Sequence, residues 1–555
     1  MLPTRLHLSQ GYLLAAIALT LFVAGAGVGV WVSYDPTLSW PIMLTLLVSI
    51  GLFFTIPFTP FSGWSKGVVI AAGLLAFYFI SQYAHFDYPL ETGTVARLGR
   101  LTGSLFPSLV IFTPHPNAAA GFIEGALLIN LVLIGRAEGR WRWFWLGLAG
   151  LLAYAVLISG SRGAWLGLAV AIGLWLLLIF REWAWPLALT GGGFVAGLLG
   201  SAYVITRLAE PGQRILLLTS LVDTAHSRLT LYHNSLQLFK DYPFTGIGLG
   251  DTFAMLYSRY QLLIQVPYLY YAHNLWLSVG LGQGVLGLLG LAGLLVAFYG
   301  FVIRVERTRP AEEMLVFFRP AWLGVTVSLV HGLADAVQFS LDFWTMPMLF
   351  VLAGLAVATG RRALAQSEQT VYVSAPSMRF RYVNLTVWGS MIGLLLLGAV
   401  FFWRPLIAAG YANLGAIYQA KADLSPTLDE TGRQQIANQA TAYFEQALQV
   451  DSAQPTANRR LGQIALENHD FETAITYLER AYTQEPDNQA IFKALGYAYL
   501  WTGRLDAAEN LFRQIDVSNR VVDELGYWQW WWGTQDRADL SAYAGEMAGR
   551  LSGGQ

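Results

Sequence analysis

Eleven stretches of mostly apolar residues fill the first 403 residues of this 555-residue chain. Each is close to the roughly 20 residues that carry a helix across the hydrocarbon core of a membrane. Only 12% of the residues are charged, about half of the fraction usual in soluble domains. A soluble fold of this size could not bury so much apolar surface, so the sequence excludes a soluble enzyme and predicts an all-α, polytopic membrane bundle. The predicted spans are residues 11–33, 41–59, 67–84, 117–135, 143–160, 163–180, 184–205, 274–303, 320–340, 343–360 and 383–403. A further apolar stretch, residues 105–113, is too short to cross; with Pro107 inside it and Pro114 after it, we expect a re-entrant or surface helix.

The basic residues between these spans predict their orientation. With the N-terminus inside, every cytoplasmic loop carries Lys or Arg, as in segments 136–142, 304–309 and 361–381. Short cytoplasmic loops are enriched in these residues. We therefore expect eleven spans in the cytoplasmic (inner) membrane, with the N-terminus in the cytoplasm and the residues after 403 on the extracytoplasmic side.

Two predicted outward loops, residues 85–116 and 206–273, also carry basic residues, among them Arg97, Arg100 and Arg214. Outward arginines run against the usual distribution. Two interpretations stay open: ordinary solvated loop residues, or a site for an anionic ligand on the outer face. The net charge of −1 gives no reason to expect nucleic-acid binding, and the absence of cysteine excludes disulfides.

The last part of the chain has a different charge and a different pattern. Residues 404–555 carry 12 Lys and Arg against 19 Asp and Glu, whereas residues 1–403 carry 22 against 16. Residues 437–516 repeat with a period of 34. The pattern resembles the tetratricopeptide repeat, with two repeats and a weaker, partial one before them. The recurring residues are Ala440, Ala474 and Ala508, then Phe444, Leu478 and Phe512, and Leu461-Gly462 with Leu495-Gly496.

We therefore expect two domains: a membrane body over residues 1–403 and an extracytoplasmic helical repeat domain over residues 404–555. Such stacks bind peptides or proteins on a concave face, which predicts a protein partner; a structural spacer or a dimerisation surface is the alternative. The tryptophan cluster Trp528–Trp532 either caps the last helix pair or rests at the membrane interface, where Trp is favoured.

Three outward segments hold residues suited to chemistry. The first is the Ser-Arg-Gly turn at residues 161–163. The second, residues 227–251, contains Arg228 and ends in a glycine string that we interpret as a tight turn returning the chain to the bilayer. The third places His273-Asn274 before a G-x-x-G pattern at 284–287. A histidine at the membrane boundary is either a satisfied interfacial residue or a general base near neutral pH.

In order and spacing, these three segments resemble the O-antigen ligase and polymerase superfamily of membrane glycosyltransferases, which includes bacterial O-linked oligosaccharyltransferases. Some members end in tetratricopeptide repeats. The oligosaccharyltransferase branch has the signature H-[NSQ]-x9-G-x-x-G-[TV], from which this chain departs at Leu288. The resemblance implies transfer of a glycan from a polyprenyl (undecaprenyl) diphosphate carrier to an acceptor hydroxyl on the outer face, without a metal or another cofactor.

The resemblance also implies roles for individual residues. Arg162 and Arg228 match family positions and would bind the diphosphate through their planar guanidinium groups, while His273 would activate the acceptor hydroxyl. Further substrate-binding candidates are Arg97, Arg100, Asn117, Arg214, Asn274 and Asp335.

Several of these candidates have a structural alternative. Asn117 could equally be a helix N-cap. His331 and Asp335 are expected one turn apart on the ninth span, in a His-x3-Asp pattern that resembles the family's. Glu124, inside the fourth span, is either a buried packing partner or functional, because charged groups in membranes are costly.

The sequence leaves the acceptor open between lipid, glycan and protein, so a polysaccharide polymerase or a protein O-oligosaccharyltransferase of the same superfamily is an alternative. A transporter of lipid-linked sugars is the alternative from another class. Transporters usually contain internal repeats, which the membrane body does not show. A scaffold would need only one or two spans.

Overall fold

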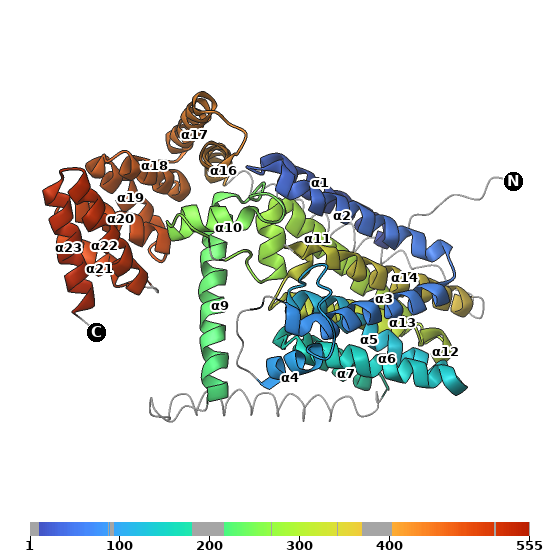
Figure 1. Cartoon of the computed structure of the whole chain (residues 1–555). Helices are drawn as coiled ribbons and strands as arrows, with labels where there is room; N and C mark the ends of the chain where they lie inside the picture. The colour runs from blue at the N-terminus through green and yellow to red at the C-terminus, as the bar shows by residue number, and fades with distance from the viewer. Residues whose placement is uncertain are drawn as a thin grey trace.

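The computed structural model describes residues 10–86, 88, 94–179, 216–267, 269–340, 342–368, 402–515 and 518–553. Within these ranges every regular element is a helix and none is a strand. Figure 1 shows a bundle of long helices with a stack of shorter helices beside it, which contains the C-terminus. The predicted all-α architecture is confirmed.

Nine helical segments in the described ranges are long and apolar enough to cross a membrane, and each coincides with a predicted span. Of the two other predicted spans, residues 184–205 and all but the last two residues of 383–403 lie outside the described residues. The spanning segments contain α1 (Gln10–Val32), α2 (Pro36–Thr55), α3 (Phe61–Gln82), α5 (Pro116–Arg136), α6 (Gly139–Ile158), α7 (Arg162–Ile179), α11 (Leu275–Arg307), α12 (Glu312–Leu315) with α13 (Phe318–Gly332), and α14 (Met346–Glu368).

Local capping signals explain where several spans begin. Asp35 caps α2 by accepting a hydrogen bond from the backbone N–H of Thr37 at 2.9 Å. Asn274 caps α11 in the same way, accepting from the backbone N–H groups of residues 276 and 277 at 3.0 and 3.2 Å. Side-chain caps of this kind satisfy backbone donors that have no partner inside the helix.

Helices α5 and α13 form the centre of the bundle, each belonging to a span window that is 67% buried. Where they cross, Gly125 and Gly324 bring the two backbones together: a Cβ atom added at Gly324 would lie 3.3 Å from the Cα of Gly125. Small residues allow such close approach between membrane helices. As a result, the polar side chains that α5 and α13 carry face each other in the protein interior.

Helix α11 is interrupted at Gly284, whose backbone adopts φ 64° and ψ −161°. The glycine string of residues 246–250 docks onto this break. The backbone N–H of Ile247 donates to the carbonyl of Leu281 at 2.6 Å, and that of Val285 donates to the carbonyl of Pro243 at 2.8 Å. Gly246, Gly248 and Gly250 have positive φ, as the predicted tight turn requires. The loop therefore supplies partners for backbone groups that the interrupted helix leaves unpaired.

Two local predictions are wrong. The apolar stretch at residues 105–113 was expected to form a re-entrant or surface helix, but the helix lies earlier, in α4 (Thr94–Gly103), and residues 105–114 form no helix. Gln82 binds both the carbonyl of Pro107 and the backbone N–H of Leu109. Pro107 and Pro114 have no backbone N–H to donate, which disfavours a helix in this segment. Side chains of α3 bind its backbone groups in place of helical hydrogen bonds.

The ninth predicted span also ends early. Helix α13 stops at Gly332, so Asp335 lies beyond the helix rather than one turn further along it. The backbone N–H of Asp335 still donates to the carbonyl of His331, at 2.8 Å. The carboxylate of Asp335 thus lies at the end of the bundle, where polar partners are within reach.

Helix α9 (Leu216–Asp241) occupies much of the described part of the predicted outward loop 206–273. It runs at a steep angle to the membrane helices in Figure 1 and is followed by a loop, α10 (Thr252–Tyr257) and the short helix η4 (Ser258–Leu262), which lie between the bundle and the repeat stack.

The repeat domain consists of four helix pairs. Equivalent contacts recur in the first three: a Cβ atom added at Gly415, Gly462 or Gly496 would lie 2.6 to 2.7 Å from Phe444, Leu478 or Phe512, respectively. The partial first repeat is thus a complete helix pair. The pairs are α16 (Trp403–Leu424) with α17 (Glu430–Val450), α18 (Pro455–Glu467) with α19 (Phe471–Gln484), α20 (Gln489–Trp501) with α21 (Leu505–Phe512), and α22 (Ser518–Thr534) with α23 (Ala538–Ser552).

The tryptophan cluster belongs to this stack. Trp532 on α22 is buried, with its ring centroid 5.5 Å from that of Trp501 on α20. Trp528 also packs against Trp501, at 6.1 Å. The cluster therefore lies inside the last helix pair and packs on the pair before it, instead of capping the end of the stack as the first interpretation proposed.

Candidate active site

His273 and Asp335 form a hydrogen-bonded pair at one end of the bundle. His273 lies directly before α11 and Asp335 directly after α13, and His273 Nδ1 is 3.1 Å from Asp335 Oδ1. The other carboxylate oxygen accepts a hydrogen bond from the side-chain amide of Asn117, at the start of α5. Three separate helix ends thus meet in one polar cluster, and all three residues are sequence-predicted site residues.

The electrostatics of this pair fix the protonation of each partner. Burial alone would raise the pKa of Asp335, but the hydrogen bond from His273 and the positive charges of the surrounding residues lower it to about 2. An ionised carboxylate only accepts hydrogen bonds, so His273 Nδ1 must carry a hydrogen. Burial lowers the pKa of His273, although the bond to Asp335 opposes this effect. At neutral pH His273 is therefore neutral with Nε2 unprotonated, and Nε2 has no hydrogen-bond partner among the described residues.

The backbone around His273 is held by several contacts. His273 has a φ of 51°, in the left-handed region that non-glycine residues rarely adopt. Tyr232 Oη lies 2.9 Å from the carbonyl of His273 and 3.1 Å from that of Leu333. Asn274 caps α11 and donates to the same Leu333 carbonyl at 3.1 Å. The ring of Tyr271 packs on the imidazole, with centroids 3.9 Å apart. The imidazole is thereby fixed in orientation while its side chain stays 16% exposed.

Arg228 supplies a positive charge next to this pair. It lies on α9, one turn before Tyr232, and its charge lowers the pKa values of both His273 and Asp335, in addition to the effects described above. Its Nη1 atom is buried and has no hydrogen-bond partner among the described residues. A buried guanidinium nitrogen without an acceptor is costly. Arg228 is therefore available to bind an anionic group beside His273.

A second polar cluster lies deeper in the bundle. His331 Nδ1 is 3.0 Å from Glu124 Oε2, and His331 Nε2 is 3.1 Å from Ser161 Oγ. The side chains of His331 and Glu124 are fully buried. The backbone hydrogen bond from Asp335 to His331 joins the two clusters. The sequence marked Glu124 and His331 as intramembrane polar residues, but it did not predict that they pair.

The structure does not gather all of the predicted site residues. Arg162 is exposed at the first position of α7, next to the Ser161 that contacts His331. Arg97 and Arg100 lie on α4, which packs against Tyr83 at the end of α3. Arg214 lies outside the described residues.

Sequence reasoning missed Tyr271 as a member of the site, and it named Ser161 only as part of the Ser-Arg-Gly turn, without its contact to His331. Tyr271 lies two residues before His273, and Ser161 directly precedes Arg162. Neither residue is charged. For Tyr271, its position close to His273 was the available signal; for Ser161, it was membership of the Ser-Arg-Gly turn.

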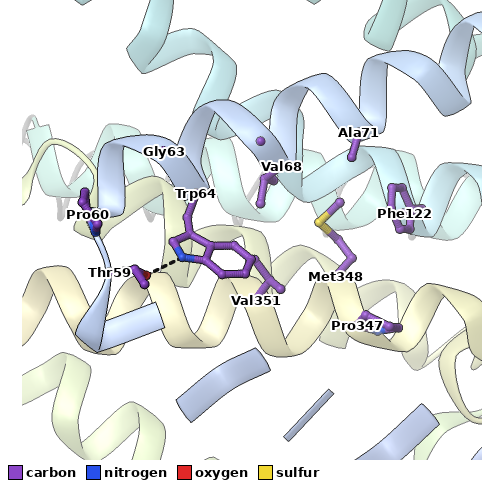
Figure 2. A pocket seen from close by; sticks show the side chains of 11 residues that line it. Thr59, Pro60, Gly63, Trp64, Val68, Ala71, Phe122, Pro347, Met348 and Val351 are labelled. Carbon is purple, nitrogen blue, oxygen red and sulfur yellow. Dashed lines mark hydrogen bonds between the residues drawn. The ribbon is translucent and has the colours of Figure 1, made fainter. Parts of the chain in front are cut away.

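An apolar cavity of about 620 Å³ lies elsewhere in the bundle, between α3, α5 and α14. Figure 2 shows Trp64 projecting into it, with its indole N–H donating to Thr59 at 2.6 Å. Its lining contains none of the polar site residues. Phe122, also in the lining, packs against Trp344, whose indole N–H donates to Asp342. Within the described ranges, no three His, Asp or Glu side chains cluster as a metal site would require.

The fold and this site define a multi-pass membrane protein with a buried His–Asp pair, an adjacent arginine and a helical repeat domain. Residues 147–292, from α6 into α11, match the O-antigen ligase family, and this match includes Arg162, Arg228 and His273. Residues 434–488 and 465–521 match tetratricopeptide repeat families. No curated protein matches the chain. The matched part of the membrane body is thus similar to O-antigen ligases and is followed by tetratricopeptide repeats, which supports a glycan-transfer function in a membrane.

Proposed function

We propose that this protein transfers a glycan from a polyprenyl diphosphate carrier to an acceptor hydroxyl on the outer face of the cytoplasmic membrane. The observation that carries the proposal is the His273–Asp335 pair beside Arg228, whose Nη1 has no partner among the described residues. This arrangement places a proton acceptor and an anion-binding group in one site, as glycan transfer from a diphosphate requires.

The transfer is a single displacement at the anomeric carbon of the donor sugar. Nε2 of His273 takes the proton of the acceptor hydroxyl while that oxygen forms the new glycosidic bond. The bond between the anomeric carbon and the phosphate oxygen breaks, and its electron pair leaves with the polyprenyl diphosphate. Asp335 stabilises the imidazolium that forms, as the carboxylate does in a catalytic triad.

The leaving diphosphate gains negative charge as this bond breaks, and Arg228 is placed to bind it. A guanidinium group binds phosphate oxygens through two parallel hydrogen bonds. Arg162 is proposed as a second diphosphate ligand on the strength of its family position. Arg97, Arg100 and Arg214 remain secondary candidates, while Asn117, Asn274 and Asp335 shape the site.

The distribution of charge supports placing the site on the outer face. The C-terminal end of α1 packs on the first part of α11, where a Cβ atom added at Gly29 would meet the carbonyl of Gly282, and Lys421 of α16 donates to the carbonyl of Trp31 at 2.9 Å. His273, which precedes α11, and its partner Asp335 therefore share one side of the bundle with the repeats. The opposite helix ends are basic and include Arg136, Arg304 and Arg319. By the positive-inside tendency these ends are cytoplasmic. The proposed division places the membrane body at residues 1–403 and the repeats outside the cytoplasm.

A reconstituted transfer assay tests the function. The purified chain is given a polyprenyl-diphosphate-linked oligosaccharide and, in separate reactions, a lipid, a glycan or an unfolded protein as acceptor, with His273→Ala as the control. We expect glycan on one acceptor class and release of polyprenyl diphosphate. The acceptor that is used separates a ligase, a polymerase and a protein oligosaccharyltransferase. Movement of the donor across vesicles without any transfer would instead indicate a transporter.

Labelling of single cysteines tests the orientation, because the chain contains no cysteine of its own. A membrane-impermeant thiol reagent applied to whole cells should label Gln265→Cys and Ser452→Cys. It should reach Glu138→Cys and Thr308→Cys only after the cells are permeabilised. Labelling of position 452 that depends on permeabilisation would place the repeats in the cytoplasm and contradict the proposal.

A further inference from the structure

The inner face of the repeat stack is covered by a segment of this same chain. The first helices of the first three pairs, α16, α18 and α20, all contact residues between the end of α9 and the end of η4. In repeat stacks this face is the extended binding surface. The covering segment, residues 241–262, is here called the docked segment.

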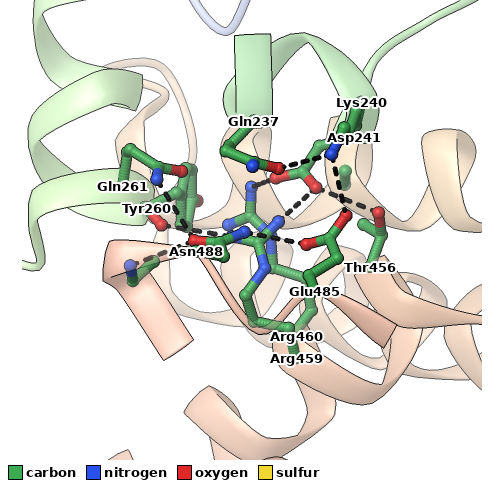
Figure 3. A network of polar contacts seen from close by, with 12 residues as sticks. Gln237, Lys240, Asp241, Tyr260, Gln261, Thr456, Arg459, Arg460, Glu485 and Asn488 are labelled. Atoms are coloured by element: carbon green, nitrogen blue, oxygen red, sulfur yellow. Dashed lines mark hydrogen bonds and ion pairs between the residues drawn. The ribbon is translucent and has the colours of Figure 1, made fainter. Parts of the chain in front are cut away.

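The centre of this contact is a fully buried ion cluster. Asp241, the last residue of α9, accepts from the guanidinium of Arg459 and from that of Arg460, the second at 2.7 Å. Thr456 donates to the same carboxylate at 3.0 Å. The side chains of Asp241, Arg459 and Arg460 are 0% exposed. Figure 3 shows both arginines reaching from α18 toward Asp241.

Tyr260 of η4 completes this cluster, because the Arg460 guanidinium lies 3.8 Å from the centre of its ring. A cation over an aromatic face is attracted to it, most strongly when both are desolvated. The cluster therefore joins both ends of the docked segment, Asp241 and Tyr260, to one helix of the repeats.

Both flanks of the docked segment are bound as well. On α16, Asn413 accepts from the backbone N–H of Phe244 at 3.1 Å and donates to Thr245 Oγ1 at 2.8 Å. On α20, Lys493 donates to the carbonyl of Leu262 at 3.1 Å. The contacts run across three repeats and include backbone groups, as recognition of a peptide ligand would. The inner face of the repeat stack is therefore occupied by a segment of the same chain.

The docked segment is continuous with both elements that build the candidate active site. Asp241 and Arg228 stand on the same helix, 13 residues and thus about 20 Å apart. In the other direction, Pro243 and Ile247 are hydrogen-bonded to the break in α11, and α11 begins beside His273. A shift of the repeats would move α9 relative to α11, and with it Arg228 relative to His273.

We propose that the inner face of the repeats takes the chain's own docked segment as its ligand, and that Asp241, Arg459 and Arg460 are positioning residues that hold Arg228 at the His273–Asp335 pair. The part of this inference that concerns transfer rests on the proposed function. Replacing a buried ion pair by apolar residues often leaves stability unchanged, whereas such a pair can enforce one register. An outside partner would then bind other surfaces of the repeats.

The docking itself is tested without any measurement of activity. Gln261→Cys places a thiol at a side chain that is 1% exposed inside the contact. We expect slow reaction of this thiol with a water-soluble reagent in the otherwise unchanged chain, and at least about tenfold faster reaction once Asp241→Asn is added. Arg460→Lys, a milder second variant, should change the rate in the same direction. The control is Arg504→Gln, which removes an exposed ion pair with Glu472 inside the repeats.

The positioning role is tested by kinetics and by a crosslink. Asp241→Asn should raise the KM for the lipid-linked donor by about 10- to 100-fold, because a displacement of about 1 Å is enough for such a loss, with a smaller effect on kcat. His233 and Asp487 form an exposed contact between α9 and the repeats, at 3.5 Å. A cleavable thiol linker between His233→Cys and Asp487→Cys should restore the KM of the Asp241→Asn chain, and cleavage should abolish the rescue.

Two results would overturn the proposal. The first is equal thiol reactivity at position 261 with and without Asp241→Asn. The second is loss of transfer when the 233–487 linker is closed in a chain that keeps Asp241. The second result would mean that the groove must open during function. If the unsubstituted chain transfers no glycan at all, the proposed function fails, and the thiol measurement still decides whether the segment is docked.

Discussion

Asp335 and Asp241 are both buried carboxylates, but their partners differ in kind. Burial would raise the pKa of each, but for Asp241 the charges of two arginines, and for Asp335 the hydrogen bond from His273 together with nearby positive charges, outweigh burial and lower it. Asp241 is bound by two arginines, which stay charged at every physiological pH. Asp335 is bound by Asn117 and by His273, a group that titrates.

The difference separates a structural cluster from a reactive one. The cluster around Asp241 is fully buried and contains no group that changes protonation near neutral pH. In the cluster around Asp335, the histidine side chain is 16% exposed and its Nε2 has no partner among the described residues. Only the second arrangement can exchange a proton with a bound molecule. Four predictions test this contrast, from the largest expected effect to the smallest.

His273→Ala should have the largest effect. It removes proton transfer, which contributes about 100- to 10,000-fold to the rate, and it leaves Arg228 in place. We expect the transfer rate to fall by that factor while binding of the lipid-linked donor stays nearly unchanged. Donor binding and turnover are measured side by side. Near-normal turnover, or a loss of donor affinity as large as that of Arg228→Lys, would show that the assigned role is wrong.

Asp335→Asn should lower the rate by about 100-fold, because the amide no longer fixes the His273 tautomer or stabilises its charged form. It should also move the pH profile. Asp335 raises the pKa of His273 against the effect of burial. Removing the carboxylate therefore lowers this pKa further, and the acidic limb of kcat/KM shifts to lower pH. A limb that stays in place, or moves to higher pH, would contradict the pairing.

Arg228→Lys should weaken donor binding by about 10- to 100-fold, since a charge-assisted contact is worth about 1.5–3 kcal/mol. Lysine keeps the charge but loses the planar two-point grip. Arg162→Lys is expected to act in the same direction. Titration with the lipid-linked donor measures the affinity, and Arg504→Gln in the repeats is the matched control. Full affinity in Arg228→Lys would show that charge alone is sufficient.

Excess EDTA should leave the rate of transfer by the purified chain unchanged, which is the smallest of the four expected effects. The arginines are proposed to neutralise the leaving diphosphate in place of a divalent ion. The transfer rate is compared with and without the chelator. Inactivation by EDTA that is reversed by adding a divalent ion would refute this part of the mechanism.

Much of the fold could be predicted because the signals lie within short segments. Nine of the predicted spans coincide with helices, since about 20 apolar residues in a row have few other stable arrangements. The repeats were recognised because a small residue (Ala440, Ala474, Ala508) and the large residue four positions later (Phe444, Leu478, Phe512) recur every 34 residues. The irregular segment at 105–114 was mispredicted because it is hydrogen-bonded to Tyr78 and Gln82, residues of another helix.

The sequence by itself determined the membrane bundle and the repeat domain, because composition and periodicity record them locally, and its motifs marked His273, Arg228 and Asp335 as candidates for the site. Only the tertiary structure decided which residues meet. It paired His273 with Asp335, 62 positions later, and His331 with Glu124. It also placed Asp241 between Arg459 and Arg460, more than 200 positions away. A hydrogen bond between distant positions depends on how helices pack, and no pattern along the chain encodes that distance.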